Sequence, residues 1–96
     1  MLLSKLVPEE VAAPAAIPLI DIKGLTADSR AVAPGFLFAA LAGSRTDGAR
    51  FVADALAKGA AAILAAEGAA IEASQHVPVL RAREPRRALS LMAARF

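Results

Sequence analysis

The sequence contains no cysteine, tryptophan or tyrosine, and it has a single histidine among its 96 residues. Without cysteine the chain cannot form a disulfide, a thiolate metal site or a cysteine nucleophile, and one histidine cannot build a histidine-rich metal site. The lack of cysteine fits a reducing compartment. We expect His76, which precedes Val77 and Pro78, to be a surface or half-buried loop residue.

Long hydrophobic runs are also missing. The first eight residues lack a basic segment followed by an apolar stretch, so no secretory signal is predicted. The apolar stretch 31–43 is interrupted by Pro34 and Gly35 and is shorter than the roughly 20 residues that span a bilayer. The sequence therefore predicts a soluble cytoplasmic protein without a membrane partner.

The composition is that of a folded protein, with 57% hydrophobic and 21% charged residues. A chain this apolar is not expected to be disordered. Its length allows one small domain, which buries roughly two thirds of the surface of the unfolded chain. Because alanine supplies much of the apolar content, we expect a core of small side chains between a few larger ones.

Positive charge is concentrated near the C-terminus. The net charge is +2, and eight of the 11 basic residues are arginine, four of which are Arg81, Arg83, Arg86 and Arg87. Such a cluster indicates either a phosphate or nucleic-acid patch or the solvated start of a helix. No aromatic residue lies among these arginines to stack on a base, which favours the helix start.

The N-terminal third predicts a helix and two short strands. Residues 2–7 form the expected helix, which Pro8 ends. Residues 8–18 carry three prolines and are expected to be an extended connection. Apolar residues at 19–22 and 25–27 predict the strands.

The middle of the chain predicts a turn, a buried strand and a helix. Pro34–Gly35 is a turn dipeptide, and the continuous apolar run 36–41 is typical of a strand buried on both faces. After a polar loop, Asp47 is the expected helix N-cap and Gly59 lies just past the expected helix end. The apolar stripe of this helix consists of Phe51, Val52, Ala55 and Leu56.

The remaining elements complete an α/β pattern. Residues 60–64 are expected to form a strand, and residues 67–75 a short helix or loop. Residues 77–80 predict a further strand, which Pro78 assigns to an edge of the sheet. Pro85 fits the first turn of a last helix, whose apolar stripe is Leu89, Met92 and Phe96. The sequence thus predicts an α/β fold with a small mixed β-sheet flanked by helices.

The loop from Gly43 to Gly48 has the GxxxxG spacing that begins a phosphate-binding P-loop. A P-loop continues with lysine and serine or threonine, whereas Ala49 and Arg50 stand here, and Asp47 would repel phosphate. We therefore exclude an ATP site. The loop can still offer hydrogen-bond donors to a small polar ligand from Ser44, Arg45 and Thr46, or it can be an ordinary polar loop.

A second polar segment, Asp28-Ser29-Arg30, follows a predicted strand. Ser29 could hydrogen-bond a ligand while Asp28 or Arg30 orients it. Alternatively, Asp28 and Ser29 cap a turn that an aspartate–arginine pair holds in place. No histidine or acidic partner lies at a spacing that would make Ser29 a nucleophile, and the sequence contains no catalytic constellation.

Together these segments resemble the N-terminal domain of the Mur ligases, and within that family the branch that adds the third residue of the peptidoglycan stem peptide. The resemblance covers nearly the whole chain. The residues that carry it are Thr26-Ala27-Asp28-Ser29-Arg30, Pro34-Gly35, Leu37-Phe38-Ala39-Ala40-Leu41, Gly43, Asp47-Gly48, Phe51, Ala55, Gly59-Ala60, Val77-Pro78-Val79-Leu80, Glu84-Pro85-Arg86-Arg87-Ala88-Leu89 and Ala93-Ala94-Arg95-Phe96.

The resemblance implies that the chain holds the UDP moiety of UDP-N-acetylmuramoyl-L-Ala-D-Glu. The residues implied to contact it are Ala27, Ser29, Ser44, Arg45 and Thr46. Those implied to shape the two loops are Asp28, Arg30, Asp47 and Gly48. The sequence departs from the family pattern at Ala27, at Ser44-Arg45 and at Phe36. Because the family often has an acidic residue at position 36, we expect the Phe36 side chain to be exposed.

The resemblance also implies that residues 1–96 are one N-terminal domain, and that the central ATPase and C-terminal domains lie outside this chain. The full-length enzyme would use ATP and Mg²⁺ to activate a carboxylate and join meso-diaminopimelate or L-lysine to it. This chain alone would be inactive and would hold no catalytic residue, metal or cofactor. Its implied partners are the UDP-linked substrate and its own other domains, and not a nucleic acid.

Two alternatives remain open at this stage. The equivalent domain of the ligase that adds D-Ala-D-Ala shares the Asp28-Ser29-Arg30 and Asp47-Gly48 signals. A small basic nucleic-acid-binding module would instead use the arginines between Arg81 and Arg87.

Overall fold

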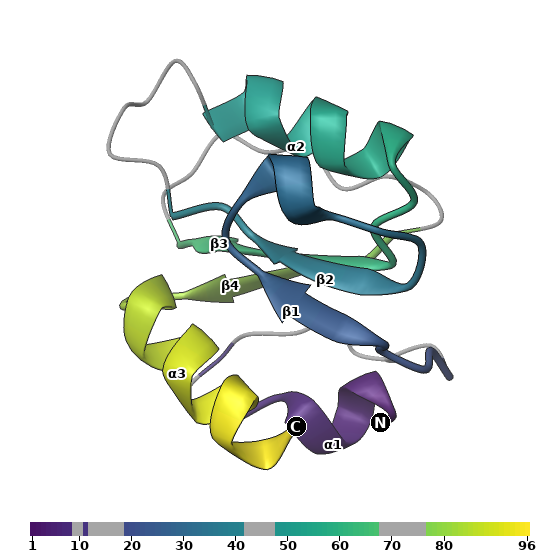
Figure 1. Ribbon diagram of the computed structural model, residues 1–96. Coiled ribbons are helices and arrows are strands. Elements are labelled where there is room, and N and C mark those ends of the chain that lie inside the picture. The colour runs from purple at the N-terminus through teal and green to yellow at the C-terminus, as the bar shows by residue number, and fades with distance from the viewer. Residues whose placement is uncertain (9–10, 12–18, 42–47, 68–76) are drawn as a thin grey trace.

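A four-stranded parallel β-sheet with helices on both faces forms the framework of the protein (Figure 1). The computed structural model describes residues 1–8, 11, 19–41, 48–67 and 77–96. The strands lie side by side in chain order and all run in the same direction. They are β1 (Gly24–Thr26), β2 (Phe36–Ala39), β3 (Ala62–Ala66) and β4 (Val79–Ala82).

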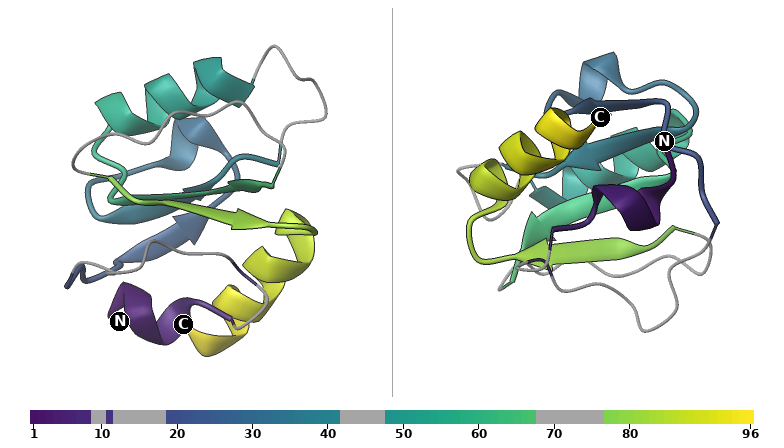
Figure 2. Two further views of the ribbon diagram at one scale, coloured as in Figure 1. Left: turned by 180° about the vertical axis from the view of Figure 1, so that it is seen from behind. Right: turned by 90° about the horizontal axis from the view of Figure 1, so that it is seen from below.

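The helices form a layer on each side of the sheet. The helix α2 (Gly48–Ala57) and the short 3₁₀ helix η1 (Ser29–Ala31) cover one face, and α1 (Leu3–Leu6) and α3 (Pro85–Arg95) cover the other (Figures 1 and 2). Figure 2 shows the two chain ends close together on the α1 and α3 side. The result is a three-layer α/β/α arrangement.

Alternating side chains of the central strands divide the core in two. In β2, Leu37 and Ala39 point toward α1 and α3, whereas Phe38 points toward α2, as the period of two in a strand requires. The cluster on the α1 and α3 side consists of Leu3, Leu6, Val11, Ile22, Leu37, Ala39, Ala62, Leu64, Leu80, Ala82, Ala88 and Met92. The cluster on the α2 side consists of Val32, Phe38, Val52, Ala55, Ala60, Ile63 and Ala65.

The predicted α/β class is confirmed, but one predicted strand is wrong. Residues 19–22 do not join the sheet. They pair with the N-terminus through a single antiparallel bridge between Leu2 and Asp21, and Leu19 is 89% exposed. The pairing stops there because the chain turns into α1 directly after Leu2. The sheet is therefore parallel rather than mixed.

The other strands and helices lie close to their predicted positions. Strand β2 is the predicted buried strand, and its last three residues are buried. Strand β4 occupies an edge of the sheet as Pro78 predicts. The boundaries of β3 and β4 lie two residues later than predicted, and Gly48 begins α2 rather than closing the preceding loop.

Two glycines form the turns that lead into β2 and β3, at the edge of the sheet where the strands begin (the amino edge). Gly59 has φ +94° and ends α2 in a Schellman motif, in which the Ala60 N–H donates to the Ala55 carbonyl and the Gly59 N–H to the Leu56 carbonyl. Gly35 has φ +88° and follows Pro34 in a turn that the Phe36 N–H closes onto the Ala33 carbonyl. The Gly35 N–H donates to the Gly59 carbonyl at 3.0 Å, so the two turns are joined.

The expectation that Phe36 is exposed is wrong, because its ring lies over Gly24. The two residues are register partners on neighbouring strands, and Phe36 is half-buried. A Cβ atom on Gly24 would lie only 2.6 Å from the Phe36 Cζ atom. The aromatic ring therefore covers the surface that the missing side chain of Gly24 leaves open.

Two other phenylalanines lie outside the stripes predicted for them. In α2, Val52 and Ala55 are buried, but Phe51 is 39% exposed beside them. In α3, Met92 is fully buried, whereas Phe96 is 51% exposed because it follows the last helical residue and no longer lies on the buried face.

Several sequence predictions fall on parts of the chain that the structure does not describe. They are most of the extended connection predicted at 8–18, the Asp47 N-cap, all but the first residue of the short helix or loop predicted at 67–75, and the position of His76. In the described part of the chain, no helix is long and apolar enough to cross a membrane.

Replacing Gly59 by alanine should lower the free energy of unfolding by about 1–3 kcal/mol, because a left-handed φ is unfavourable for a residue with a Cβ atom. The added Cβ would also lie 3.0 Å from the Pro34 Cα atom. Gly59→Asn should cost less, because asparagine tolerates this region better. Urea unfolding of the three proteins measures the difference, and equal stability of Gly59→Ala and the parent would contradict this role.

Met92→Ala should destabilise the protein by about 2–5 kcal/mol, because Met92 is fully buried between α3 and the sheet. Phe96→Ala is the matched control, since its half-exposed side chain should cost less than about 1 kcal/mol. Thermal unfolding followed by circular dichroism compares the two variants. A larger loss for Phe96→Ala would show that the α3 core is misassigned.

Candidate functional site

The turn after β1 is held by hydrogen bonds among its own polar residues. The Thr26 Oγ1 atom accepts from the Asp28 N–H at 3.0 Å, and the Asp28 Oδ1 atom accepts from the Arg30 N–H at 2.9 Å. The Asp28 carboxylate thereby caps η1, which begins at Ser29. The backbone of this turn is fixed by residues 26–30 themselves.

The side chains of Asp28 and Arg30 also form an ion pair. The Arg30 Nε atom lies 3.2 Å from Oδ1 of Asp28, and Arg30 Nη2 lies 3.2 Å from Oδ2. The pKa of Asp28 is lowered mainly by the hydrogen bond from the Arg30 side chain, and to a smaller extent by the hydrogen bond from the Arg30 backbone N–H. In turn, the Asp28 carboxylate raises the pKa of Arg30. Both side chains are exposed, so the pair orients the turn more than it stabilises the fold.

Ser29 is the buried residue of this turn. It is 7% exposed, and its carbonyl accepts a hydrogen bond of 2.9 Å from the Lys58 Nζ atom. Lys58 follows the last residue of α2, so this bond ties η1 to that helix. Ala27, by contrast, is exposed at the end of β1.

The chain leaves β1 and β2 at the same edge of the sheet. The two strands are adjacent and parallel, with Thr26 opposite Phe38. Ala40 continues beyond β2 and its N–H donates to the Leu64 carbonyl at 2.7 Å. Leu41 is the last described residue before the second polar loop, in which Ser44, Arg45, Thr46 and Asp47 lie outside the described residues.

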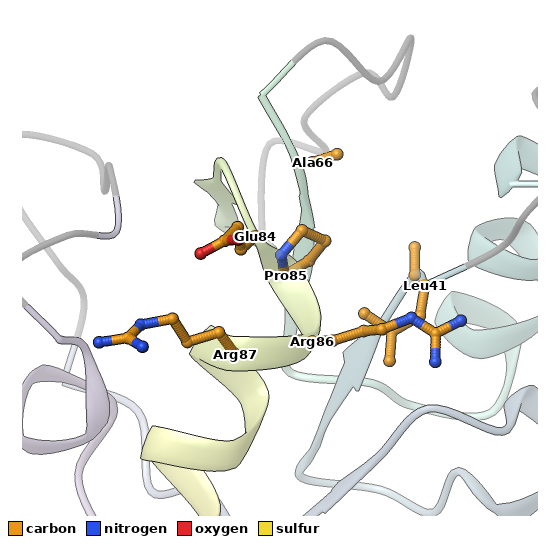
Figure 3. Close-up of a pocket in the computed structure, with 7 residues that line it drawn as sticks. Leu41, Ala66, Glu84, Pro85, Arg86 and Arg87 are labelled. Carbon is orange, nitrogen blue, oxygen red and sulfur yellow. The ribbon is translucent and has the colours of Figure 1, made fainter.

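A pocket of about 420 Å³ opens at this same carboxyl edge (Figure 3). Ala40 and Leu41 line it after β2, Ala66 at the end of β3, and the first turn of α3 lines it after β4. The lining residues are Ala40, Leu41, Ala66, Glu84, Pro85, Arg86 and Arg87. The carboxyl edge of a parallel sheet is the usual place for a ligand in an α/β protein.

The arginine cluster predicted from the sequence is divided by the fold. Arg81 lies in β4, where its Nη1 atom donates to the Ala66 carbonyl at 3.4 Å. Arg83 is exposed and lies 4.0 Å from the Glu67 carboxylate. Arg86 and Arg87 are exposed in the first turn of α3 and line the pocket. The sequence did not point to Leu41 and Ala66, since apolar residues at strand ends carry no signal of a pocket.

Comparison with known proteins gives a family match over most of the chain. The protein-family model described as "Mur ligase family, catalytic domain" matches residues 21–96. Among similar proteins is the UDP-N-acetylmuramoyl-L-alanyl-D-glutamate--2,6-diaminopimelate ligase of Agrobacterium fabrum, which is 55% identical over 80 residues, covering 83% of this chain and 16% of that protein. The ligase of the same name from Bradyrhizobium diazoefficiens is 46% identical over all 96 residues, or 19% of its own length.

A solved structure shares the fold as well. The crystal structure of MurF from Acinetobacter baumannii superimposes with a TM-score of 0.62 and 31% sequence identity, covering 83% of this chain and 17% of the other. The chain thus spans less than one fifth of the length of these relatives. By the extent of the family match and its identity to these ligases, the chain belongs to the Mur ligase family.

Proposed function

We propose that this chain is the N-terminal domain of a ligase that adds diaminopimelate to UDP-N-acetylmuramoyl-L-Ala-D-Glu, and that it binds the UDP moiety of that substrate. The observation that carries the proposal is the 55% identity to a ligase of that name over 83% of the chain. Relatives from Brucella melitensis and Caulobacter vibrioides have the same name and are 53% and 56% identical.

The geometry of the carboxyl edge supports a nucleotide site there. The turn 27–30 and the segment that begins at Leu41 leave neighbouring parallel strands at the same edge. The turn 27–30 is fixed by the hydrogen bonds of Asp28, and the carbonyl of its buried Ser29 is bonded to Lys58 at the end of α2. A turn fixed in this way is suited to holding its part of a ligand in one orientation.

In this proposal the ligand contacts come from both segments. Ala27 and Ser29 contact the uridine from the turn after β1, and Ser44, Arg45 and Thr46 contact it from the loop after β2. Asp28 and Arg30 hold the first turn through their ion pair, and Asp47 and Gly48 shape the second loop.

The role of such a domain is to position a substrate whose reacting group lies elsewhere. Binding of the remote nucleotide lowers the entropy that is lost when the reacting carboxylate is brought into place. ATP and Mg²⁺ would be bound by other domains of the longer enzyme, which are also the proposed partners of this domain. The proposed location is the cytoplasm.

The alternative assignment to the D-Ala-D-Ala-adding ligase has weaker support. A matched structure carries a name of that type, UDP-N-acetylmuramoylalanyl-D-glutamyl-2,6-diaminopimelate--D-alanyl-D-alanyl ligase, and is 31% identical to this chain. The diaminopimelate ligases reach 46–56% identity over comparable or longer stretches. The higher identity favours the diaminopimelate branch.

Titration of the ¹⁵N-labelled chain with UMP should shift the amide signals of residues 27–30 and 43–48, because both segments would line the uridine site. Titration with a short single-stranded RNA is the control for general attraction of anions to the arginines. The RNA should cause weaker changes that disappear as salt is raised. If RNA binds tightly around Arg81–Arg87 while UMP shifts nothing, the nucleic-acid module would be the better assignment.

Ser29→Ala should weaken UMP binding by about 1 kcal/mol, or roughly fivefold in Kd, if the hydroxyl makes one neutral hydrogen bond to the uridine. Ser90→Ala is the matched control, because Ser90 lies on the exposed side of α3. Both affinities come from the same NMR titration, in which the spectrum also reports whether the variant is folded. An unchanged Kd for a folded Ser29→Ala protein would remove Ser29 from the site.

A further inference from the structure

The pocket at the start of α3 lies on the same sheet edge as the proposed uridine site but is formed by other residues. The uridine segments follow β1 and β2, whereas this pocket extends across the ends of β2 and β3 to the residues after β4. Leu41 lines the pocket and directly precedes the loop that carries Ser44, Arg45 and Thr46. The two sites therefore adjoin at the end of β2.

The charge of the pocket is unevenly distributed. Figure 3 shows the Arg86 side chain extending from the first turn of α3 toward Leu41, while Glu84 and Arg87 extend to the opposite side. Apart from these three, the lining side chains are Ala40, Leu41, Ala66 and Pro85, which carry no charge. On the side facing Leu41, the pocket thus combines an apolar wall with a guanidinium group.

A guanidinium group beside an apolar wall is suited to a phosphate. Its planar donors match two phosphate oxygens at once, and a hydrogen bond to an ionised phosphate is stronger than one between neutral groups. The carboxylate of Glu84 is directed away from this side, so it does not oppose an anion there.

The spacing of the strands fits a nucleotide lying along the edge. Neighbouring strands are about 4.8 Å apart, so the ends of β1 and β3 are separated by roughly 10 Å. An extended nucleoside diphosphate with its base near the end of β1 would reach the end of β3 with its phosphates.

We propose that this pocket receives the diphosphate of the uridine nucleotide and that Arg86 is the side chain that binds it. The inference rests on the proposed function, because it presupposes that the uridine lies between the ends of β1 and β2. It adds a positioning residue to that site, on an element that the uridine itself does not contact.

The test compares ligands that differ only in their phosphates. Dissociation constants for uridine, UMP and UDP would be measured by NMR titration for the parent chain, Arg86→Ala, Arg86→Lys and Arg83→Ala. Arg83→Ala removes the same charge from an exposed position outside the pocket. Uridine serves as an internal control, because a variant that has lost its fold would lose uridine binding too.

Arg86→Ala should weaken UDP binding about tenfold and leave uridine binding unchanged, as expected for loss of hydrogen bonds to a charged group. Arg86→Lys should recover part of the loss, and Arg83→Ala should change either affinity less than about twofold. An unchanged ratio of UDP to uridine affinity in Arg86→Ala, or an equal effect of Arg83→Ala, would overturn the role of Arg86 and leave the uridine site intact. If the parent chain binds neither uridine nor UDP, the proposed function fails and this inference fails with it.

Discussion

The parallel, in-register pairing of β1 with β2 is the constraint on which the rest of the molecule depends. Thr26 lies opposite Phe38, so the chain leaves both strands at the same edge. One connection passes through η1 and the other leads into α2, and both return to the amino edge on the same face of the sheet (Figure 1). The polar turn 28–30 after β1 and Leu41, the last described residue after β2, therefore both lie at the edge where α/β proteins bind ligands.

That pairing is secured at the opposite edge, away from the candidate site. The turn at Gly35 and the end of α2 at Gly59 are joined by a hydrogen bond, and Phe36 packs over Gly24 at the start of β1. These contacts need residues without a Cβ atom. The glycines of the amino edge therefore serve the fold rather than the candidate site.

The sequence predicted most of the fold because its signals are local. Pro34–Gly35, Gly59 and Pro85 mark turns or helix ends by their backbone preferences, and the apolar run after Gly35 marks the buried strand β2. The error at residues 19–22 has a different origin. A short apolar segment can pair with any available backbone edge, and here it pairs with the N-terminal residues through the bridge between Leu2 and Asp21. The positions of Phe36, Phe51 and Phe96 depend on packing partners far away in the sequence, which no local pattern contains.

The candidate site was predictable only in part, for the same reason. The hydrogen-bonding capacity of Asp28 and Arg30 could be read from their residue types, and the structure joins them. The pocket at the start of α3 brings together residues from three separate segments, among them Leu41, Ala66 and Arg86, and only the order of the strands makes them neighbours.

The most direct test of a single uridine site at the carboxyl edge is a measurement of nuclear Overhauser effects from the uracil H5 and H6 protons of bound UMP. The account predicts effects to amide protons both in 27–30 and in 44–46 of the same complex, whereas effects to Gly35 or Gly59 at the amino edge, or to one of the two segments alone, would contradict it.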